Sequence, residues 1–216
     1  MAEFVDIPSP GWPLEFGEPG RPGIVIVHDD YGRLPYLEAY AKSLANQGFF
    51  VAVPDLFDGR ATIQAAGAAE LAARLDPGFA LAALDDAVAL VRGHGATRVG
   101  LIGLGLGGRL ALRLAQSGAA DAVVAYYATL GDDEAGIIPC PVLVHRAGAD
   151  DDRAESLAVD EFVSRLKEHG TPVTQHRYAA AHEGFANATM LELLDKNAAA
   201  LAFARSTYFL QAQLLD

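Results

Sequence analysis

The sequence contains a single cysteine, Cys140, among 216 residues. One cysteine cannot form an internal disulfide, and it excludes a zinc site built from several thiolates. Basic residues are also scarce, since 16 Lys and Arg stand against 28 Asp and Glu, a net charge of -12. A phosphate backbone or an anionic membrane surface would repel such a chain, so we expect neither nucleic acid nor a membrane as a partner.

Long hydrophobic runs are absent as well. The longest purely apolar stretches, such as residues 23–27, fall far short of the ~20 residues that span a bilayer. Residues 1–8 lack the basic and apolar regions of a signal peptide, so we expect a soluble protein of the reducing cytoplasm. Apolar residues make up 51% of the chain and charged residues 20%, as in an ordinary globular protein. The length favours one domain over residues 1–216.

Short apolar runs alternate with longer stretches of helical spacing. Strands are predicted over 24–27, 49–53, 98–102, 122–127, 141–145 and 173–178, and helices over 35–47, 61–75, 79–92, 106–116, 154–169 and 195–213. This alternation predicts an α/β fold with a doubly wound, mainly parallel sheet. The first 22 residues are rich in Pro and Gly and predict a small hairpin lid with short edge strands.

The junction after the predicted strand 98–102 is rich in glycine and has two interpretations. Gly103-x-Gly105-x-x-Gly108 satisfies the dinucleotide-binding fingerprint, but the next strand does not end in the acidic residue that would hold a ribose. Gly103 and Gly107 also fit the small flanks of a nucleophile elbow, a strained turn that lifts one side chain above the sheet. We favour the elbow, and we expect no cofactor.

Several motifs together resemble the dienelactone hydrolase family of α/β-hydrolases. The elbow of that family reads Gly-x-Cys-x-Gly-Gly or Gly-x-Ser-x-Gly-Gly. The other matching segments are residues 24–32 with the oxyanion loop, 48–57, 138–145 with the turn at 148–150, and the histidine loop at 181–187. The resemblance covers about residues 4–210 and implies an α/β-hydrolase fold in a single domain.

The resemblance also assigns roles to individual residues. The order nucleophile, acid, histidine falls on Gly105, Asp150 and His182, with Asp151 and Asp152 as rival acids. Gly105 has no side chain, so the covalent route of the family is excluded at the elbow.

The dyad of His182 and Asp150 remains a competent general base, unless His182 is a relic of a decayed site. The backbone N–H groups of Leu106 and Asp30 are the expected oxyanion hole. The expected pocket residues, which would suit a partly aromatic substrate, are His28, Asp29, Tyr31, Phe57, Tyr127 and Phe185. Asp29 stands where the family has a glutamate.

Two other groups have simpler explanations. Cys140 precedes its strand, on the wrong side of the sheet for a displaced nucleophile, and is expected to be buried packing. The acidic cluster 150–152 is expected to hold the family acid with two solvated neighbours and not a divalent metal ion.

The favoured function is non-covalent His/Asp general-base chemistry on a small carbonyl, lactone or polyketide-like metabolite of secondary metabolism. Hydration, elimination, isomerisation and cyclisation all fit. Two alternatives are an ester or lactone hydrolase whose nucleophile was replaced by glycine, and an inactive binding or assembly module. The only partner predicted is a small-molecule substrate, and no pattern specifies an oligomeric state.

Overall fold

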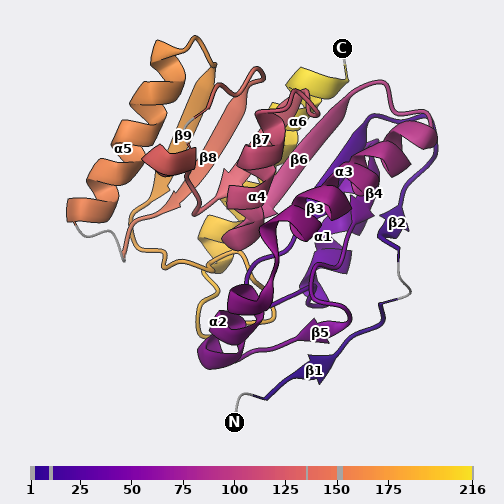
Figure 1. Ribbon diagram of the computed structural model, residues 1–216, viewed down its shortest axis with the longest axis horizontal. Helices are drawn as coiled ribbons and strands as arrows, with labels where there is room; N and C mark the ends of the chain where they lie inside the picture. Colours follow the sequence, from indigo (N-terminus) through magenta and orange to yellow (C-terminus); the bar gives the residue numbers. More distant parts are fainter. Residues whose placement is uncertain (1–2, 10–11, 135, 150–152, 216) are drawn as a thin grey trace.

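The computed structural model describes residues 3–9, 12–134, 136–149 and 153–215. Seven strands form one sheet in the order β2-β4-β3-β6-β7-β8-β9, with helices on both sides (Figure 1). Its strands are β2 (Leu14–Phe16), β3 (Gly23–Val27), β4 (Phe50–Val53), β6 (Val99–Leu104), β7 (Ala122–Tyr126), β8 (Val142–Ala147) and β9 (Val173–Tyr178). The pairs from β4 to β9 are parallel, which confirms the predicted doubly wound α/β sheet.

The central strands are buried on both faces, which explains why they are almost continuously apolar. The helices are α1 (Tyr36–Ala45), α2 (Ala65–Arg74), α3 (Pro77–Gly93), α4 (Leu106–Ala115), α5 (Arg153–Glu168) and α6 (Lys196–Leu214). One hydrophobic cluster joins the sheet to α3, α4 and α5, and a second joins its other face to α1 and α6. Helices α1, α3, α4, α5 and α6 therefore each bury an apolar stripe against the sheet.

The boundary between α2 and α3 shows why the predicted break at residues 76–78 is also a helix start. The Asp76 side chain accepts the Phe79 N–H at 2.7 Å, and Pro77 occupies the first helical position. Proline is well placed there, because the first helical N–H has no partner within the helix. Helix α3 therefore begins two residues before the predicted start at Phe79.

The predicted N-terminal hairpin is wrong. Strand β1 (Val5–Asp6) pairs with β5 (Arg60–Ala61), whereas β2 adds to the edge of the main sheet against β4. Both pairings are antiparallel. The two short strands thus find partners far along the chain instead of each other.

A chain of buried hydrogen bonds links β7 and β8 to α1 and α6. His145 contacts the Tyr178 hydroxyl through Nδ1 and the Ser206 hydroxyl through Nε2, both at 2.9 Å. Ser206 also lies 2.8 Å from the hydroxyl of Tyr126, which reaches the hydroxyl of Tyr40 at 3.0 Å. Burial lowers the pKa of His145 to about 3, so the imidazole is neutral in the folded protein.

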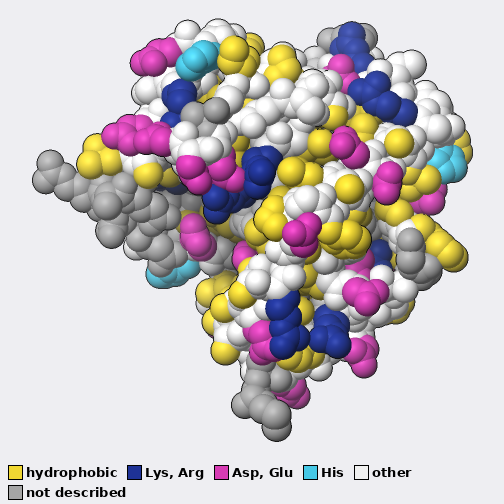
Figure 2. Space-filling model, in the orientation of Figure 1, with side chains coloured by type: hydrophobic (Ala, Val, Ile, Leu, Met, Phe, Trp, Pro, Cys, Tyr) yellow, Lys and Arg dark blue, Asp and Glu magenta, His cyan; other side chains and the backbone are white. Residues whose placement is uncertain are grey.

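None of the described helices is long and apolar enough to cross a bilayer. On the face drawn in Figure 2, Lys and Arg side chains lie in small groups among acidic ones, in keeping with the net charge of -12.

Ser206→Ala should lower the free energy of unfolding by about 1–3 kcal/mol, because it leaves buried groups of His145 and Tyr126 without their shared partner. Ser43→Ala, on the exposed side of α1, is the matched control and should change stability by less than about 0.5 kcal/mol. Urea unfolding of both variants measures the difference. Equal losses would contradict a stabilising role for the buried chain.

Candidate active site

The turn between β6 and α4 has the backbone conformation of an elbow. Gly105 has φ +50° and ψ -119°, a region that residues with a side chain rarely adopt. Its N–H donates to the Tyr126 carbonyl at 3.1 Å, and its own carbonyl accepts the Arg109 N–H at 3.1 Å. The turn therefore joins β7 on one side and begins α4 on the other.

The glycines on both sides of Gly105 are required by close packing. A Cβ on Gly103 would collide with the backbone of Gly107 and Gly108, and a Cβ on Gly107 would collide with the carbonyl groups of Val27 and His28. Contact between the first turn of α4 and the adjacent strands thus explains the glycine pattern without a dinucleotide.

The Asp30 side chain lies against the space that a side chain at position 105 would enter. A Cβ built on Gly105 would lie 3.1 Å from Asp30 Oδ2. The same oxygen accepts the N–H of Leu106 in a long contact of 3.4 Å. Leu106 was predicted to donate to a substrate oxyanion, but here its N–H faces a carboxylate of the protein itself.

Asp29, next to it, is almost fully buried and holds the site together. Its oxygens accept the Tyr31 N–H at 3.1 Å, the Asn187 side-chain amide at 2.9 Å and the Tyr36 hydroxyl at 3.4 Å. Burial raises the pKa of Asp29 to about 7, although these three donors favour the ionised form. Asp29 therefore links the oxyanion loop to the histidine loop and does not face open solvent.

His28 and Phe57, two of the predicted pocket residues, are buried and pack together. Their ring centroids are 4.8 Å apart. His28 Nδ1 lies 2.7 Å from the Asp29 carbonyl, and Nε2 accepts the Leu56 N–H at 3.0 Å. Burial also lowers the pKa of His28, so the ring is neutral. Both ring nitrogens form hydrogen bonds with backbone groups, which argues against contact between His28 and a substrate.

His182 is exposed on the loop between β9 and α6. The turn that begins there is closed by the Phe185 N–H, which donates to the His182 carbonyl at 3.1 Å. The predicted acid Asp150 and its rivals Asp151 and Asp152 lie outside the described residues. The pairing of His182 with an acid therefore stays a prediction.

Tyr127 and Phe185 form an aromatic wall beside the elbow, with ring centroids 5.5 Å apart. Tyr127 Cε2 would lie 3.9 Å from a Cβ on Gly105. Tyr31, the remaining aromatic candidate, is half-buried on the oxyanion loop. Phe185 is fully buried, so Tyr127 and Tyr31 are the better candidates for substrate contact.

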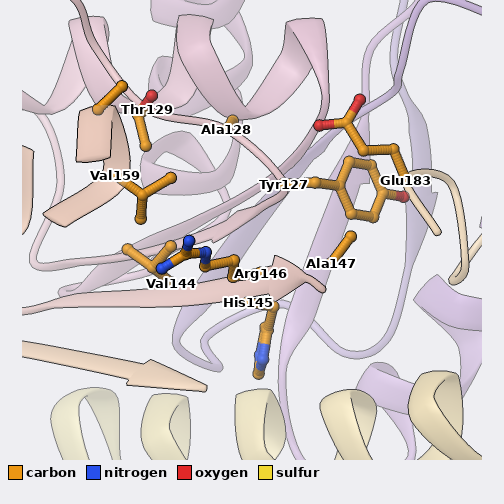
Figure 3. Close-up of a pocket in the computed structure, with 10 residues that line it drawn as sticks. Tyr127, Ala128, Thr129, Val144, His145, Arg146, Ala147, Val159 and Glu183 are labelled. Carbon is orange, nitrogen blue, oxygen red and sulfur yellow. The ribbon is translucent and has the colours of Figure 1, made fainter. Parts of the chain in front are cut away.

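A cavity of about 110 Å³ opens at the carboxyl ends of β7 and β8, against α5. Tyr127 and Glu183 lie at one end of it, and Thr129 and Val159 lie toward the other (Figure 3). Tyr127 therefore belongs both to this cavity and to the wall of the elbow.

Other candidate chemistry is weaker. Cys140 is buried, as expected, and burial raises the pKa of its thiol to about 12, so it is not a thiolate at neutral pH. Among the described residues, no cluster of three or more His, Cys, Asp or Glu side chains could hold a metal ion. The acidic run 150–152 lies outside the described residues.

Sequence analysis missed three contributions: the side chain of Asp30, and the bonds that Asn187 and Tyr36 make to Asp29. One signal for the role of Asp30 was available. Two consecutive aspartates follow shortly after β3, and the neighbouring strand β6 leads to an elbow with glycine at position 105. No local pattern indicates that Asn187, 158 positions away from Asp29, reaches the first loop.

The pKa of Asp29 predicts a pH-dependent stability. An unfolded Asp loses its proton near pH ~4, whereas folded Asp29 keeps it up to about pH 7, so stability falls as pH rises through that window. Asp29→Asn has no proton to lose. Relative to the wild type, it should gain on the order of 2–4 kcal/mol between about pH 4 and pH 8.

Urea unfolding of the two proteins across this range measures the change. His145 contributes equally to both and cancels in the difference. A difference that does not vary with pH would contradict a protonated, buried Asp29.

Comparison with known proteins agrees with this geometry. The family model of the dienelactone hydrolase family matches residues 15–214. A dienelactone hydrolase-like promiscuous phosphotriesterase from metagenomic libraries superimposes with a TM-score of 0.79 and 20% identity, covering 99% of this chain and 98% of that one. Dienelactone hydrolase from Anabaena variabilis gives 0.70 and 18%, covering 99% and 98%.

At these identities the structural likeness establishes the fold, which is that of the α/β-hydrolases. No curated protein matches the chain. Since the family model covers residues 15–214 of 216, the chain belongs to the dienelactone hydrolase family.

Proposed function

We propose that this protein catalyses general-base chemistry on a small carbonyl, lactone or polyketide-like metabolite, without a covalent intermediate on the elbow residue. Hydration, elimination, isomerisation and cyclisation are the reaction types that need no nucleophile there. The substrate is the expected partner, and the reaction belongs to the cytoplasm and to secondary metabolism.

One observation carries the proposal. Gly105 keeps the elbow conformation although it has no side chain to present, and a carboxylate from the neighbouring loop fills the space. The Leu106 N–H, the proposed oxyanion donor, contacts that carboxylate at 3.4 Å.

His182 is the proposed general base, with Asp150 as the residue that orients its ring. A carboxylate behind an imidazole holds the correct tautomer and stabilises the imidazolium ion that forms when the base takes a proton. The exposure of His182 leaves it accessible to water and to a substrate.

Two alternatives remain. Ester or lactone hydrolysis is favoured by the names of the similar structures, yet it needs a nucleophile other than residue 105. An inactive binding module is favoured by the tight filling of the elbow space by Asp30 and Tyr127.

We expect no burst phase and no trapped acyl-enzyme with para-nitrophenyl acetate, because glycine cannot be acylated and the Cys140 thiol is buried with a raised pKa. Intact-protein mass spectrometry after rapid mixing measures this. A stoichiometric acetyl adduct within the site would contradict the proposal and favour hydrolysis.

Gly105→Ser should create esterase activity roughly tenfold or more above the parent, because the elbow again presents a hydroxyl beside the histidine loop. The new Cβ would meet Asp30 Oδ2 at 3.1 Å, so the carboxylate must shift by a few tenths of an ångström. Hydrolysis of para-nitrophenyl acetate measures the gain.

Gly105→Ala is the matched control, since it adds the same Cβ without a hydroxyl. The gain should disappear in Gly105→Ser combined with His182→Ala. A folded Gly105→Ser protein with no gain would mean that the roles assigned to the histidine and to the elbow are wrong.

A further inference from the structure

Three groups of the protein surround the space above Gly105. A Cβ added to Gly105 would lie 3.1 Å from Asp30 Oδ2, 3.6 Å from Asp29 Cβ and 3.9 Å from Tyr127 Cε2. The vacated position therefore lies between a carboxylate and an aromatic ring, and what these two groups can do together decides its chemistry.

The Asp30 carboxylate is oriented by the protein and can still contact a bound molecule. The Leu106 N–H contacts Oδ2 at 3.4 Å, and the side chain is half-buried, so the carboxylate is oriented while remaining within reach of a bound molecule. Asp29 is a poorer candidate for proton transfer, because its two oxygens already accept three donors in the interior.

The Tyr127 hydroxyl is a hydrogen-bond donor with no acceptor among the described residues. The hydroxyl oxygen is buried and has no hydrogen-bond partner within the described part of the chain. An unsatisfied buried hydroxyl lowers the stability of the folded protein. The Tyr127 backbone is also held at φ +39°, which is strained for a residue with a side chain. Burial raises the pKa of Tyr127 well above its usual value, so the hydroxyl keeps its proton at neutral pH.

We infer that Asp30 is a catalytic base for a carbon acid, and that the Tyr127 hydroxyl donates to the oxygen of the enolate that forms. The substrate class is a ketone with an activated C–H next to the carbonyl, such as a β,γ-unsaturated ketone. The inference rests on the proposed function: it keeps the non-covalent general-base chemistry, selects proton transfer at carbon, and assigns the base to Asp30 in place of His182.

The step balances without any other reagent. Asp30 takes the proton from the carbon beside the carbonyl, the C–H electron pair becomes the enolate double bond, and the carbonyl π pair moves onto oxygen. Tyr127 stabilises that charge by a hydrogen bond. The proton then returns to the same carbon or to the γ carbon, and the second outcome is an isomerisation.

Phenolates imitate an enolate, so binding of para-nitrophenolate tests the inference without knowledge of the natural substrate. Asp30→Asn should bind the phenolate roughly tenfold or more tightly than the wild type, because a carboxylate beside the anion repels it. That gain should be lost in Asp30→Asn combined with Tyr127→Phe. Absorbance titration of the dye measures both.

Asp85→Asn, on the exposed side of α3, is the control for a general change in net charge and should leave affinity unchanged. Tyr127→Phe alone should keep or raise the melting temperature, because it removes an unpartnered hydroxyl. Equal phenolate affinity in the wild type and Asp30→Asn, or a gain that survives loss of the Tyr127 hydroxyl, would overturn the inference.

Isomerisation rates of the wild type and of two variants distinguish a failure of this inference from a failure of the proposed function. The wild type should isomerise a β,γ-unsaturated cyclohexenone faster than buffer, with a loss of about 10²–10⁴-fold in Asp30→Asn. If His182→Ala abolishes the rate while Asp30→Asn keeps it, the proposed function stands and the inference fails. If the wild type shows no rate above buffer, the proposed function fails for this substrate class and so does the inference.

Discussion

Helix α4 leaves the sheet so close to β3 and β6 that its first turn rests on their backbones. No Cβ fits at Gly103 or Gly107, and this contact fixes the direction of the turn between them. The elbow geometry therefore does not depend on the side chain at position 105. With glycine at position 105, the Leu106 N–H contacts Asp30 Oδ2, which lies 3.1 Å from where a Cβ on Gly105 would be.

The polar interior shows a contrast that bears on function. The imidazole of His145 and the hydroxyls of Ser206 and Tyr126 are hydrogen-bonded to one another in one buried chain. The Tyr127 hydroxyl, attached to the residue after Tyr126, is left without a partner in the described structure. Since buried polar groups are generally satisfied, an unpaired donor beside the elbow is the kind of exception that a binding site explains.

Much of the architecture could be predicted because it depends on regular patterns. Apolar runs marked the parallel strands β3, β4, β6, β7 and β8, and glycine spacing marked the elbow, because both patterns reflect close packing inside the protein. The N-terminal strands could not be placed, because β1 and β2 pair with distant segments. Within the site, the position of Asp30 was predicted but not the direction of its side chain, which turns toward the space that a side chain at position 105 would enter.

The crystal structure of the protein with para-nitrophenol bound is the most direct test of a proton-transfer site at the elbow. We expect the phenolate oxygen within about 3 Å of the Tyr127 hydroxyl, with the ring above Gly105 and beside the Asp30 carboxylate. A ligand that binds elsewhere, with Asp30 still against Leu106 and Tyr127 in contact only with the protein, would contradict this role for the site.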